Sequence, residues 1–295
     1  MVARCSRSRR RRTMHAMRMT TLTKRTVAAL AVLGLGSIML LASPGAHAAD
    51  STAKVAVTFD GAKLTGFPAK LKGGLTEITL TNTGKFGIDL ELLSLVGTHT
   101  DAEYVAARHS DTPPKWVEGR GGVASTAARS SNSVTANLDK GTYVWSVSSN
   151  GSELDGKEPL GRFAVTSAKS TAPLPGGAAS ISTKEYGFDT KGLKAGVNTV
   201  SVSNKGKEWH HVIMAKITAG KTIEDLKKEL TSNLQGPPQT IDQSTQQFLP
   251  MMNPGVSYVT KITLQPGTYG FVCFMPDAKG KPHVMDGMVQ EVKIA

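Results

Sequence analysis

Residues 78–95, ITLTNTGKFGIDLELLSL, align without a gap with residues 200–217, VSVSNKGKEWHHVIMAKI. Both stretches begin with alternating apolar and polar residues and then reach an Asn-x-Gly-Lys sequence, at Asn82 and at Asn204. Such alternation is typical of half-buried β-strands, and Asn next to Gly is typical of a turn. The pair therefore predicts one strand–turn–strand unit that occurs twice in the chain.

The similarity continues beyond this pair. A helix-like segment follows in each copy, at 101–108 and at 222–230, and VTANLDKGTYVWSV (134–147) then matches VTKITLQPGTYGFV (259–272). In the second helix, Thr222 and Asp225 have the spacing of a capping box. We interpret this similarity as an internal duplication, which predicts two units of the same fold.

Short alternating strands in units of this length favour an antiparallel β-sandwich. Residues 167–180, SAKSTAPLPGGAAS, are small or rich in Pro and Gly and are typical of a linker. We therefore expect an all-β chain with two tandem antiparallel β-sandwich domains, at 50–166 and 181–295, each with a short helical insertion.

Residues 1–48 have the features of a secretory signal peptide. Basic residues precede an apolar run at 27–42, and Ala46-His47-Ala48 forms an A-x-A cleavage site. Cleavage there predicts a secreted or extracytoplasmic protein with no stable membrane span. The alternative is that the leader stays uncleaved and anchors the chain.

Removal of this leader changes the charge of the chain. Nine of the 35 Lys and Arg residues, but none of the 23 Asp and Glu residues, lie in 1–48, so the remainder carries 26 basic against 23 acidic groups. The mature protein therefore has no basic footprint for nucleic acid, and we expect no nucleic-acid partner. The sequence also lacks a Gly-rich phosphate loop and the paired cysteines of a zinc site.

The stretch at 267–294, GTYGFVCFMPDAKGKPHVMDGMVQEVKI, carries the chemistry. It carries Cys273, His283 and Met288 on two predicted strands, 268–274 and 288–294, and on the loop between them. Cys273 is the only cysteine left after the leader. A lone cysteine in an exported protein is a small buried apolar residue, an intermolecular bridge or a metal ligand. Thiolate, imidazole and thioether together suit copper better than the oxygen-seeking ions magnesium and calcium.

These residues resemble the cupredoxins, the small blue copper proteins of the plastocyanin and azurin type. EWHHVI (208–213) is similar to the aromatic-Pro-His-Asn-Val-Val segment of that family, and HVMDGM (283–288) has its His-x4-Met spacing. The resemblance implies one type 1-like copper bound by His210, Cys273 and His283, with Met288 as a weak axial ligand. Met288 could equally be an apolar core residue at the start of a strand.

Two features depart from the family pattern. Nine residues separate Cys273 from His283, where the family has two to four, so the loop could hold its ligands less rigidly. The first copy lacks the ligands, since its alignment sets Ile88, Val147 and Arg162 in place of His210, Cys273 and Met288. We interpret the first copy as a degenerate cupredoxin-like domain without metal.

The expected function is electron transfer, or the holding of copper, outside the cytoplasmic membrane. The partner would be a redox protein or a copper donor or acceptor. Only five histidines follow the leader and none forms His-x-His, which is too few for the second copper centre of copper oxidases and nitrite reductases. We therefore expect a protein that is not an enzyme. The alternative is a metal-free tandem β-sandwich that acts as a binding module at the cell wall or surface.

Overall fold

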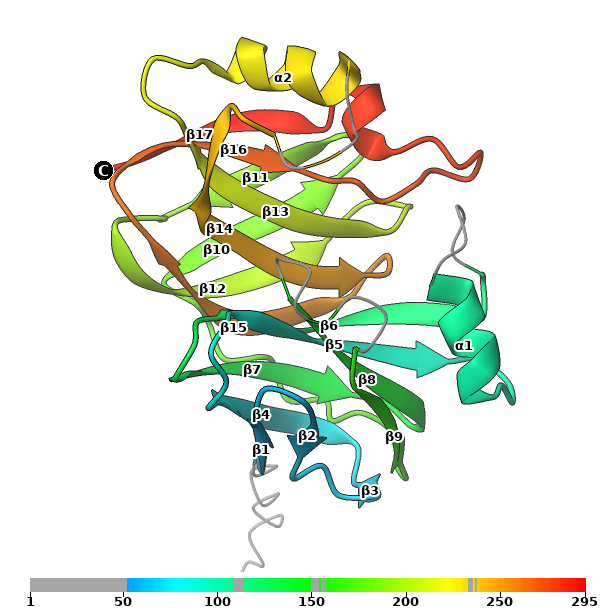
Figure 1. Ribbon diagram of the computed structural model, residues 1–295. Helices are drawn as coiled ribbons and strands as arrows, with labels where there is room; N and C mark the ends of the chain where they lie inside the picture. The colour runs from blue at the N-terminus through cyan, green and yellow to red at the C-terminus, as the bar shows by residue number, and fades with distance from the viewer. Residues whose placement is uncertain (1–51, 109–113, 150–153, 155–157, 233–235, 237) are drawn as a thin grey trace, which may run out of the picture. The chain divides into compact units, whose positions relative to one another are not determined.

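Strands make up most of the part of the chain that the computed structural model describes (Figure 1). That part comprises residues 52–108, 114–149, 154, 158–232, 236 and 238–295. It belongs to one unit of the chain, His47–Ala295. The leader predicted at 1–48 falls outside the described residues. Within the described residues, no helix is long and apolar enough to cross a membrane.

The first half of the described chain contains nine strands and one helix. In chain order they are β1 (Ala53–Phe59), β2 (Leu64–Thr65), β3 (Lys70–Leu71), β4 (Gly74–Asn82), β5 (Ile88–Leu95), α1 (Asp101–Arg108), β6 (Val117–Thr126), β7 (Ser130–Leu138), β8 (Gly141–Ser149) and β9 (Leu160–Val165).

The second half contains eight strands, one α-helix and one 3-10 helix among its described residues. They are β10 (Ala179–Lys184), β11 (Gly187–Lys191), β12 (Gly196–Asn204), β13 (His210–Ile217), α2 (Ile223–Ser232), β14 (Ile241–Met252), β15 (Ser257–Leu264), β16 (Gly267–Val272), η1 (His283–Asp286) and β17 (Val289–Ile294).

The strands form where the sequence alternates. In β4 every second side chain is buried, and Ile78 and Leu80 are fully inaccessible to solvent. In β12 the buried positions again alternate from Asn198, with Val200 and Val202 completely enclosed. Period-two burial is what a strand requires when one face packs on a core. The all-β prediction is confirmed.

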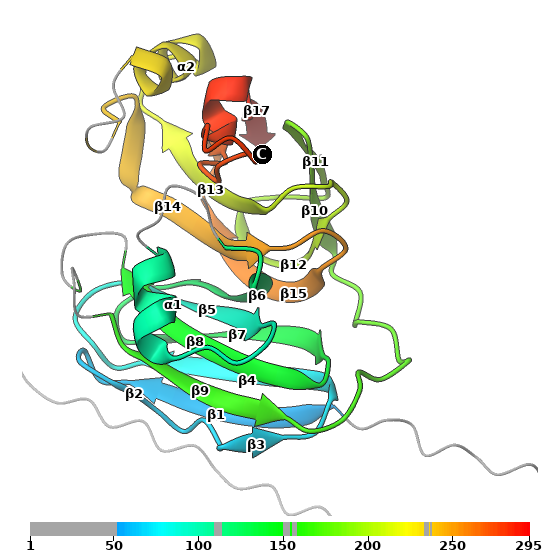
Figure 2. The ribbon, with the colours of Figure 1, turned by 90° about the vertical axis from the view of Figure 1, so that its right-hand side faces the viewer.

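Two sheets run through both halves. One has the strand order β11-β10-β12-β15-β7-β4-β1-β2, and the other has the order β17-β16-β13-β14-β6-β5-β8-β9-β3 (Figures 1 and 2). The halves join edge to edge where β15 pairs with β7 and where β14 meets β6. Most neighbours are antiparallel, but β1 with β4, β10 with β12 and β3 with β9 are parallel. The main apolar core lies between the sheets and takes residues from both halves.

The junction between the halves is tightly packed. Backbone and side chain of Asn253 hydrogen-bond the backbone of Gly119 across it, at 3.0 and 2.6 Å. Gly121 has φ +79°, and a Cβ atom there would lie 2.2 Å from the ring of Tyr258. Only glycine fits this position, because it tolerates positive φ and leaves room for the ring.

The two helices begin at similar caps. Helix α1 has the predicted bounds, and the carboxylate of Glu103 accepts a hydrogen bond from the backbone N–H of Thr100. At α2 the predicted capping box is present, since the Asp225 carboxylate accepts from the N–H of Thr222 at 2.8 Å. The apolar face of α2 packs on the residues around the C-terminal loop, namely Val272, Val284 and Val289. Helix α2 therefore covers the loop that carries the candidate ligands.

Candidate metal centre

His210 is the first residue of β13, and a turn holds it there. Asn204, fully buried at the end of β12, donates from Nδ2 to the carbonyls of Glu208 (2.7 Å) and Met252 (3.0 Å). Its Oδ1 accepts from the N–H of Gly206 at 2.9 Å. These three bonds close the Asn-x-Gly turn recognised in the sequence. They direct the chain from β12 to β13 and so fix where His210 starts.

Cys273 follows directly after β16. We expected a strand as far as Phe274, but pairing with β17 ends at Val272. The N–H of Cys273 still donates to the carbonyl of Met288, at 3.3 Å, and the cysteine is a free, fully buried thiol. Cys273 therefore lies where the β16–β17 pairing ends, next to Met288, the predicted axial ligand.

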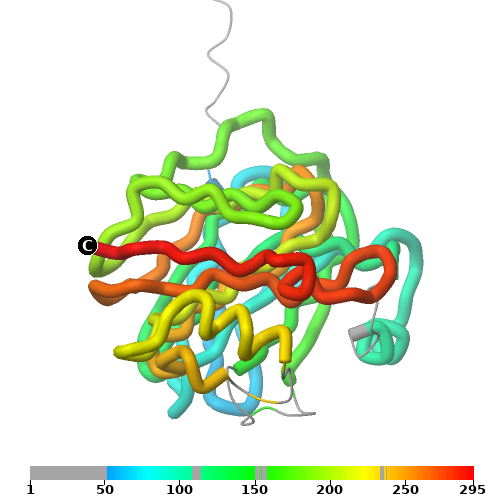
Figure 3. The backbone as a smooth tube through the Cα atoms, turned by 90° about the horizontal axis from the view of Figure 1, so that it is seen from above, coloured from blue at the N-terminus to red at the C-terminus, as the bar shows by residue number. Residues whose placement is uncertain are grey.

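The long loop between Cys273 and His283 is closed at its base. The N–H of His283 donates to the carbonyl of Met275 at 2.8 Å, and Pro276 bridges Pro282. Beyond that bridge Asp277 orders a tight turn, because its Oδ1 accepts from two backbone N–H groups at 2.7 and 2.8 Å. The extra residues thus form a small hairpin of their own. Figure 3 shows the chain passing from β16 through this loop into the red strand β17.

Three of the four predicted ligands come together in the protein interior. Nδ1 of His210 lies 3.1 Å from Nδ1 of His283, and Sγ of Cys273 lies 3.8 and 3.6 Å from these two atoms. All three residues are completely buried. Within the described residues, these three side chains form a cluster that could hold a metal ion, since their ligand atoms all lie within 4.8 Å of one another.

The spacing of these donors matches a metal site. Metal bonds of about 2.0 Å to nitrogen and about 2.3 Å to sulfur place planar donors about 3.5 Å (N to N) and about 3.7 Å (N to S) apart. The observed separations of 3.1, 3.6 and 3.8 Å are close to these values. Two imidazoles and one thiolate are the equatorial set of type 1 copper. The site fits a single type 1-like copper.

Met288 is fully buried in the main core, next to Cys273 in the backbone hydrogen-bond pattern. This position is compatible both with core packing and with a thioether near the metal. Its role as a ligand stays a prediction.

Burial keeps the site uncharged without metal. It raises the pKa of the Cys273 thiol to about 12, although the backbone N–H groups of His211 and Met275 point at the sulfur and act in the opposite direction. Burial, followed by the proximity of His283, lowers the pKa of His210 to about 4. Burial also lowers the pKa of His283, against the opposing charge of Glu208. Both imidazoles are therefore neutral at pH 7, the form that binds a metal.

This shift makes the stability of the metal-free protein pH-dependent. Unfolded His210 has a pKa of about 6.5, so protons bind the unfolded chain first and stability falls as pH drops from 6.5 towards 4. We expect His210 alone to remove about 2 kcal/mol between pH 7.5 and pH 5, where carboxylates are still ionised. Urea unfolding at the two pH values measures the loss, and His210→Asn should reduce it. Equal urea midpoints would contradict the prediction.

The sequence analysis did not predict that two carboxylates, of Glu185 and Glu208, lie next to the candidate ligands. Oε2 of Glu208, in the β12–β13 turn, lies 2.9 Å from Nε2 of His283. Oε1 of Glu185, in the β10–β11 turn, lies 3.6 Å from Nε2 of His210. Neither contact has hydrogen-bond geometry, although both Nε2 atoms are buried. Glu208 is only two residues from His210 in sequence, but nothing in the sequence connects Glu185 with the site.

His211 supports the loop from the other side of β13. Its Nε2 accepts a hydrogen bond from the N–H of Phe274 at 2.9 Å, and burial, with the nearby imidazoles, lowers its pKa to about 3. The neutral ring thus fixes the residue that follows Cys273. The sequence alignment set His211 on a family asparagine, outside the ligand set, and its side chain is absent from the cluster of three.

We expect His211→Ala to weaken copper binding about tenfold, the lower end of the range for losing a residue that orients a ligand. The reason is that Phe274, and with it the Cys273 backbone, loses its anchor. Competition with a chelator of known affinity measures the change. His99→Ala, a histidine stacked on Trp116 in the first half, is the control and should leave copper affinity unchanged. Equal affinities in both variants would refute the anchoring role.

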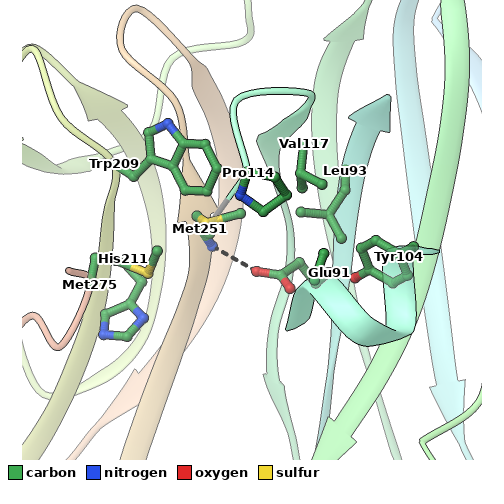
Figure 4. Close-up of a pocket in the computed structure, with 10 residues that line it drawn as sticks. Glu91, Leu93, Tyr104, Pro114, Val117, Trp209, His211, Met251 and Met275 are labelled. Atoms are coloured by element: carbon green, nitrogen blue, oxygen red, sulfur yellow. Dashed lines mark hydrogen bonds between the residues drawn. The ribbon is translucent and has the colours of Figure 1, made fainter. Parts of the chain in front are cut away.

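A pocket of about 230 Å³ adjoins the same segment (Figure 4). His211, Met275 and Trp209 line one side, and residues of the first half line the other. Across it the N–H of Met251 donates to Oε1 of Glu91 at 3.2 Å. Trp209 and Met275 also pack against the cluster of buried residues that includes Leu93 and Tyr104, so the segments that flank the site contact the first half.

One backbone hydrogen bond of the first half resembles the bond between Cys273 and Met288. The N–H of Val147 donates to the carbonyl of Pro159 at 2.9 Å, as the N–H of Cys273 donates to that of Met288. Val147 thus corresponds to Cys273, as the alignment has it. In this hydrogen-bond pattern Pro159 takes the place of Met288, whereas the sequence alignment sets Arg162 there.

Comparison with known proteins gives structural matches only. No family model matches the chain, and no curated protein does. Among solved structures, reduced auracyanin from the photosynthetic bacterium Roseiflexus castenholzii is 24% identical, with 39% of this chain and 94% of that chain covered and a TM-score of 0.26. Copper nitrite reductase from Nitrosomonas europaea is 10% identical, with coverage of 83% and 94% and a TM-score of 0.24. A multicopper oxidase is 12% identical, with coverage of 82% and 88% and a TM-score of 0.22.

TM-scores below 0.5 transfer no residue role to this chain. Its own strands and donors define it as an all-β sandwich with a buried His–Cys–His centre that fits one type 1-like copper. Enzymes stand among the matched structures, and they contradict our expectation that the protein is not an enzyme. That expectation rested on counting histidines, which bears only on a second copper centre built within one chain.

Proposed function

We propose that the protein is exported and binds one mononuclear copper in its second half, through His210, Cys273 and His283 with Met288 as axial ligand. Its function would be electron transfer or the holding of copper outside the cytoplasmic membrane. The observation that carries this proposal is the convergence of two Nδ1 atoms and one Sγ atom within 3.8 Å in a fully buried site.

The residues have separate parts in this function. A copper ion bound there would supply a one-electron Cu(II)/Cu(I) couple. On binding, the Cys273 thiol would give up its proton and donate as thiolate, while both neutral imidazoles would donate through Nδ1. The donors lie on β13 and on both sides of the closed loop hairpin, so the folded sandwich holds them in one place. A site held in this way changes little between two oxidation states, which suits electron transfer.

The first half would be a degenerate cupredoxin-like domain at 50–166, followed by a linker at 167–180 and the copper domain at 181–295. Two observations support this. The same pairings recur, since β5 with β8 and β8 with β9 repeat as β13 with β16 and β16 with β17. The positions that correspond to His210, Cys273 and Met288 carry Ile88, Val147 and Pro159, which offer no metal-binding side chain. The first half would then serve to support the copper domain.

Export is supported by the leader at 1–48 and by the single cysteine that follows it. Mass spectrometry of the protein recovered outside the cytoplasm should give a chain that starts at residue 49. The proposed partner is a redox protein or a copper donor or acceptor.

A copper titration tests the proposal. We expect the purified protein to bind one Cu(II) per chain and to develop an intense thiolate-to-copper absorption band. A parallel titration with Zn(II), which also accepts Cys and His ligands but is colourless, is the control. Copper binding without the band would favour copper holding over electron transfer. Absence of stoichiometric binding would refute the copper function and leave the metal-free binding module.

A further inference from the structure

We propose that Glu185 and Glu208 are positioning residues of the metal centre: they hold the Nε2 sides of His210 and His283 and favour Cu(II) over Cu(I). This inference rests on the proposed copper function. Its first part concerns the protein without metal, and its second part concerns the loaded site.

Each imidazole faces two ways. The Nδ1 atoms of His210 and His283 face each other and Cys273, whereas each Nε2 faces a carboxylate, at 3.6 Å from Glu185 and 2.9 Å from Glu208. Both rings are completely buried, so water does not reach these Nε2 atoms. In a neutral imidazole the proton sits on the nitrogen that meets an acceptor. Neither contact has hydrogen-bond geometry, so each carboxylate acts on its Nε2 as a nearby negative charge. The closer one, Glu208, favours the proton of His283 on Nε2, which leaves Nδ1 of His283 free to accept a hydrogen bond from Nδ1 of His210 in the protein without metal.

Glu185 is held in place by the turn that carries Glu208. Its Oε1 accepts hydrogen bonds from the backbone N–H groups of Lys207 and Glu208, the second at 2.8 Å. Burial acts to raise the pKa of Glu185, but these N–H groups outweigh it and hold the pKa below its usual value. A Cβ atom on Gly206 would lie 2.4 Å from the same oxygen, so this glycine makes room for the carboxylate.

Glu208 has a partner of its own in Tyr186. The hydroxyl of Tyr186 donates to Oε2 of Glu208 at 3.3 Å, and its ring packs edge-on against His283 with centroids 5.1 Å apart. Tyr186 directly follows Glu185 in the β10–β11 turn, so one short segment supplies both contacts. The β10–β11 and β12–β13 turns thus place two carboxylates next to the two Nε2 atoms.

The charges also act on the metal. Two carboxylates next to the ligands stabilise the more positive oxidation state, because a negative charge attracts Cu(II) more strongly than Cu(I). The side chains of Glu185 and Glu208 are 30% and 28% exposed, so solvent screens this attraction only in part. The result is a lower reduction potential than the same donor set would have without them.

The potential tests the second part. We expect Glu208→Gln to raise the ratio of Cu(I) to Cu(II) affinity about tenfold, which is about 59 mV in a one-electron couple. Glu185→Gln should act in the same direction but less strongly, because its contact is longer. Glu208→Asp keeps the charge and should stay closer to the original potential. The control is Glu77→Gln, because the Glu77 carboxylate on β4 pairs with Lys54 on β1. This variant should leave the reduction potential unchanged.

NMR of the metal-free protein tests the first part separately. Long-range nitrogen–proton spectra of the imidazoles should show protonated Nε2 in His283, the ring with the closer carboxylate, and Glu208→Ala should move that proton. Should the wild-type protein bind no copper, the copper function fails and these spectra alone decide the positioning role. Unchanged potentials in both Gln variants, or unchanged tautomers in Glu208→Ala, would overturn the proposal. If Glu208→Gln does not fold, Glu185→Gln carries the same test.

Discussion

Replacing Cys273 by serine should abolish the intense visible band of the copper-loaded protein and weaken copper binding at least a hundredfold. The thiolate is the anionic donor among the three converging side chains, and a serine hydroxyl neither ionises near neutral pH nor gives the same charge-transfer transition. Absorption during Cu(II) titration, together with chelator competition, measures both effects.

The chain offers a matched control for this variant. Val147 occupies the corresponding position in the first half, is also fully buried, and makes the corresponding backbone hydrogen bond. Both Cys273→Ser and Val147→Ser bury a hydroxyl, at a cost of about 1–3 kcal/mol each. We expect both variants to fold and only Cys273→Ser to lose the band. A band that survives in Cys273→Ser would show that copper binds elsewhere.

Much of the fold was predictable, because local sequence and tertiary packing agree there. The alternating strands at β4 and β12 pack one face on the core, and the Asn82 and Asn204 turns use buried side-chain hydrogen bonds that the Asn-x-Gly sequence allows. Helix α2 was predictable for the same reason, since its capping box and apolar face both point to one start and one buried side.

The candidate site was predictable only where its donor residues stand in recognisable sequence motifs. His210, Cys273 and His283 were found from motif positions, although the nine-residue separation left the rigidity of the loop open. Sequence could not show that the Pro276–Pro282 bridge closes the extra residues into a hairpin. Loop closure depends on pairing between residues several positions apart, which composition does not reveal.

The carboxylates near the site show a different limit. Glu185 reaches His210 only because β10 and β12 are neighbours in one sheet, a long-range pairing that no local pattern encodes. Ordinary acidic residues in turns give no signal of such contacts. The repeat alignment sets Arg162 opposite Met288, whereas the strand register sets Pro159 there, because register depends on long-range pairing that the local sequence does not show.

The similar turns at Asn82 and Asn204 allow the most informative stability experiment, in which the turn asparagine is removed from each half. Asn204→Ala deletes two hydrogen bonds donated by Nδ2 and one accepted by Oδ1, all at a buried site. At about 1 kcal/mol for each bond, we expect a loss of about 3 kcal/mol in the free energy of unfolding. Asn82→Ala removes the corresponding bonds to Phe86, Thr126 and Gly84 and should cost a similar amount.

Copper distinguishes the two variants. The turn at Asn204 carries Glu208 and leads directly into His210, so its loss should weaken copper binding at least tenfold in addition to the loss of stability. The turn at Asn82 leads into Ile88, which has no donor atom in its side chain, so Asn82→Ala should bind copper as the original protein does. Urea unfolding and chelator competition on both variants give the four values required. If copper affinity falls equally in both, the effect follows from general stability, and the turn at Asn204 has no special part in placing His210.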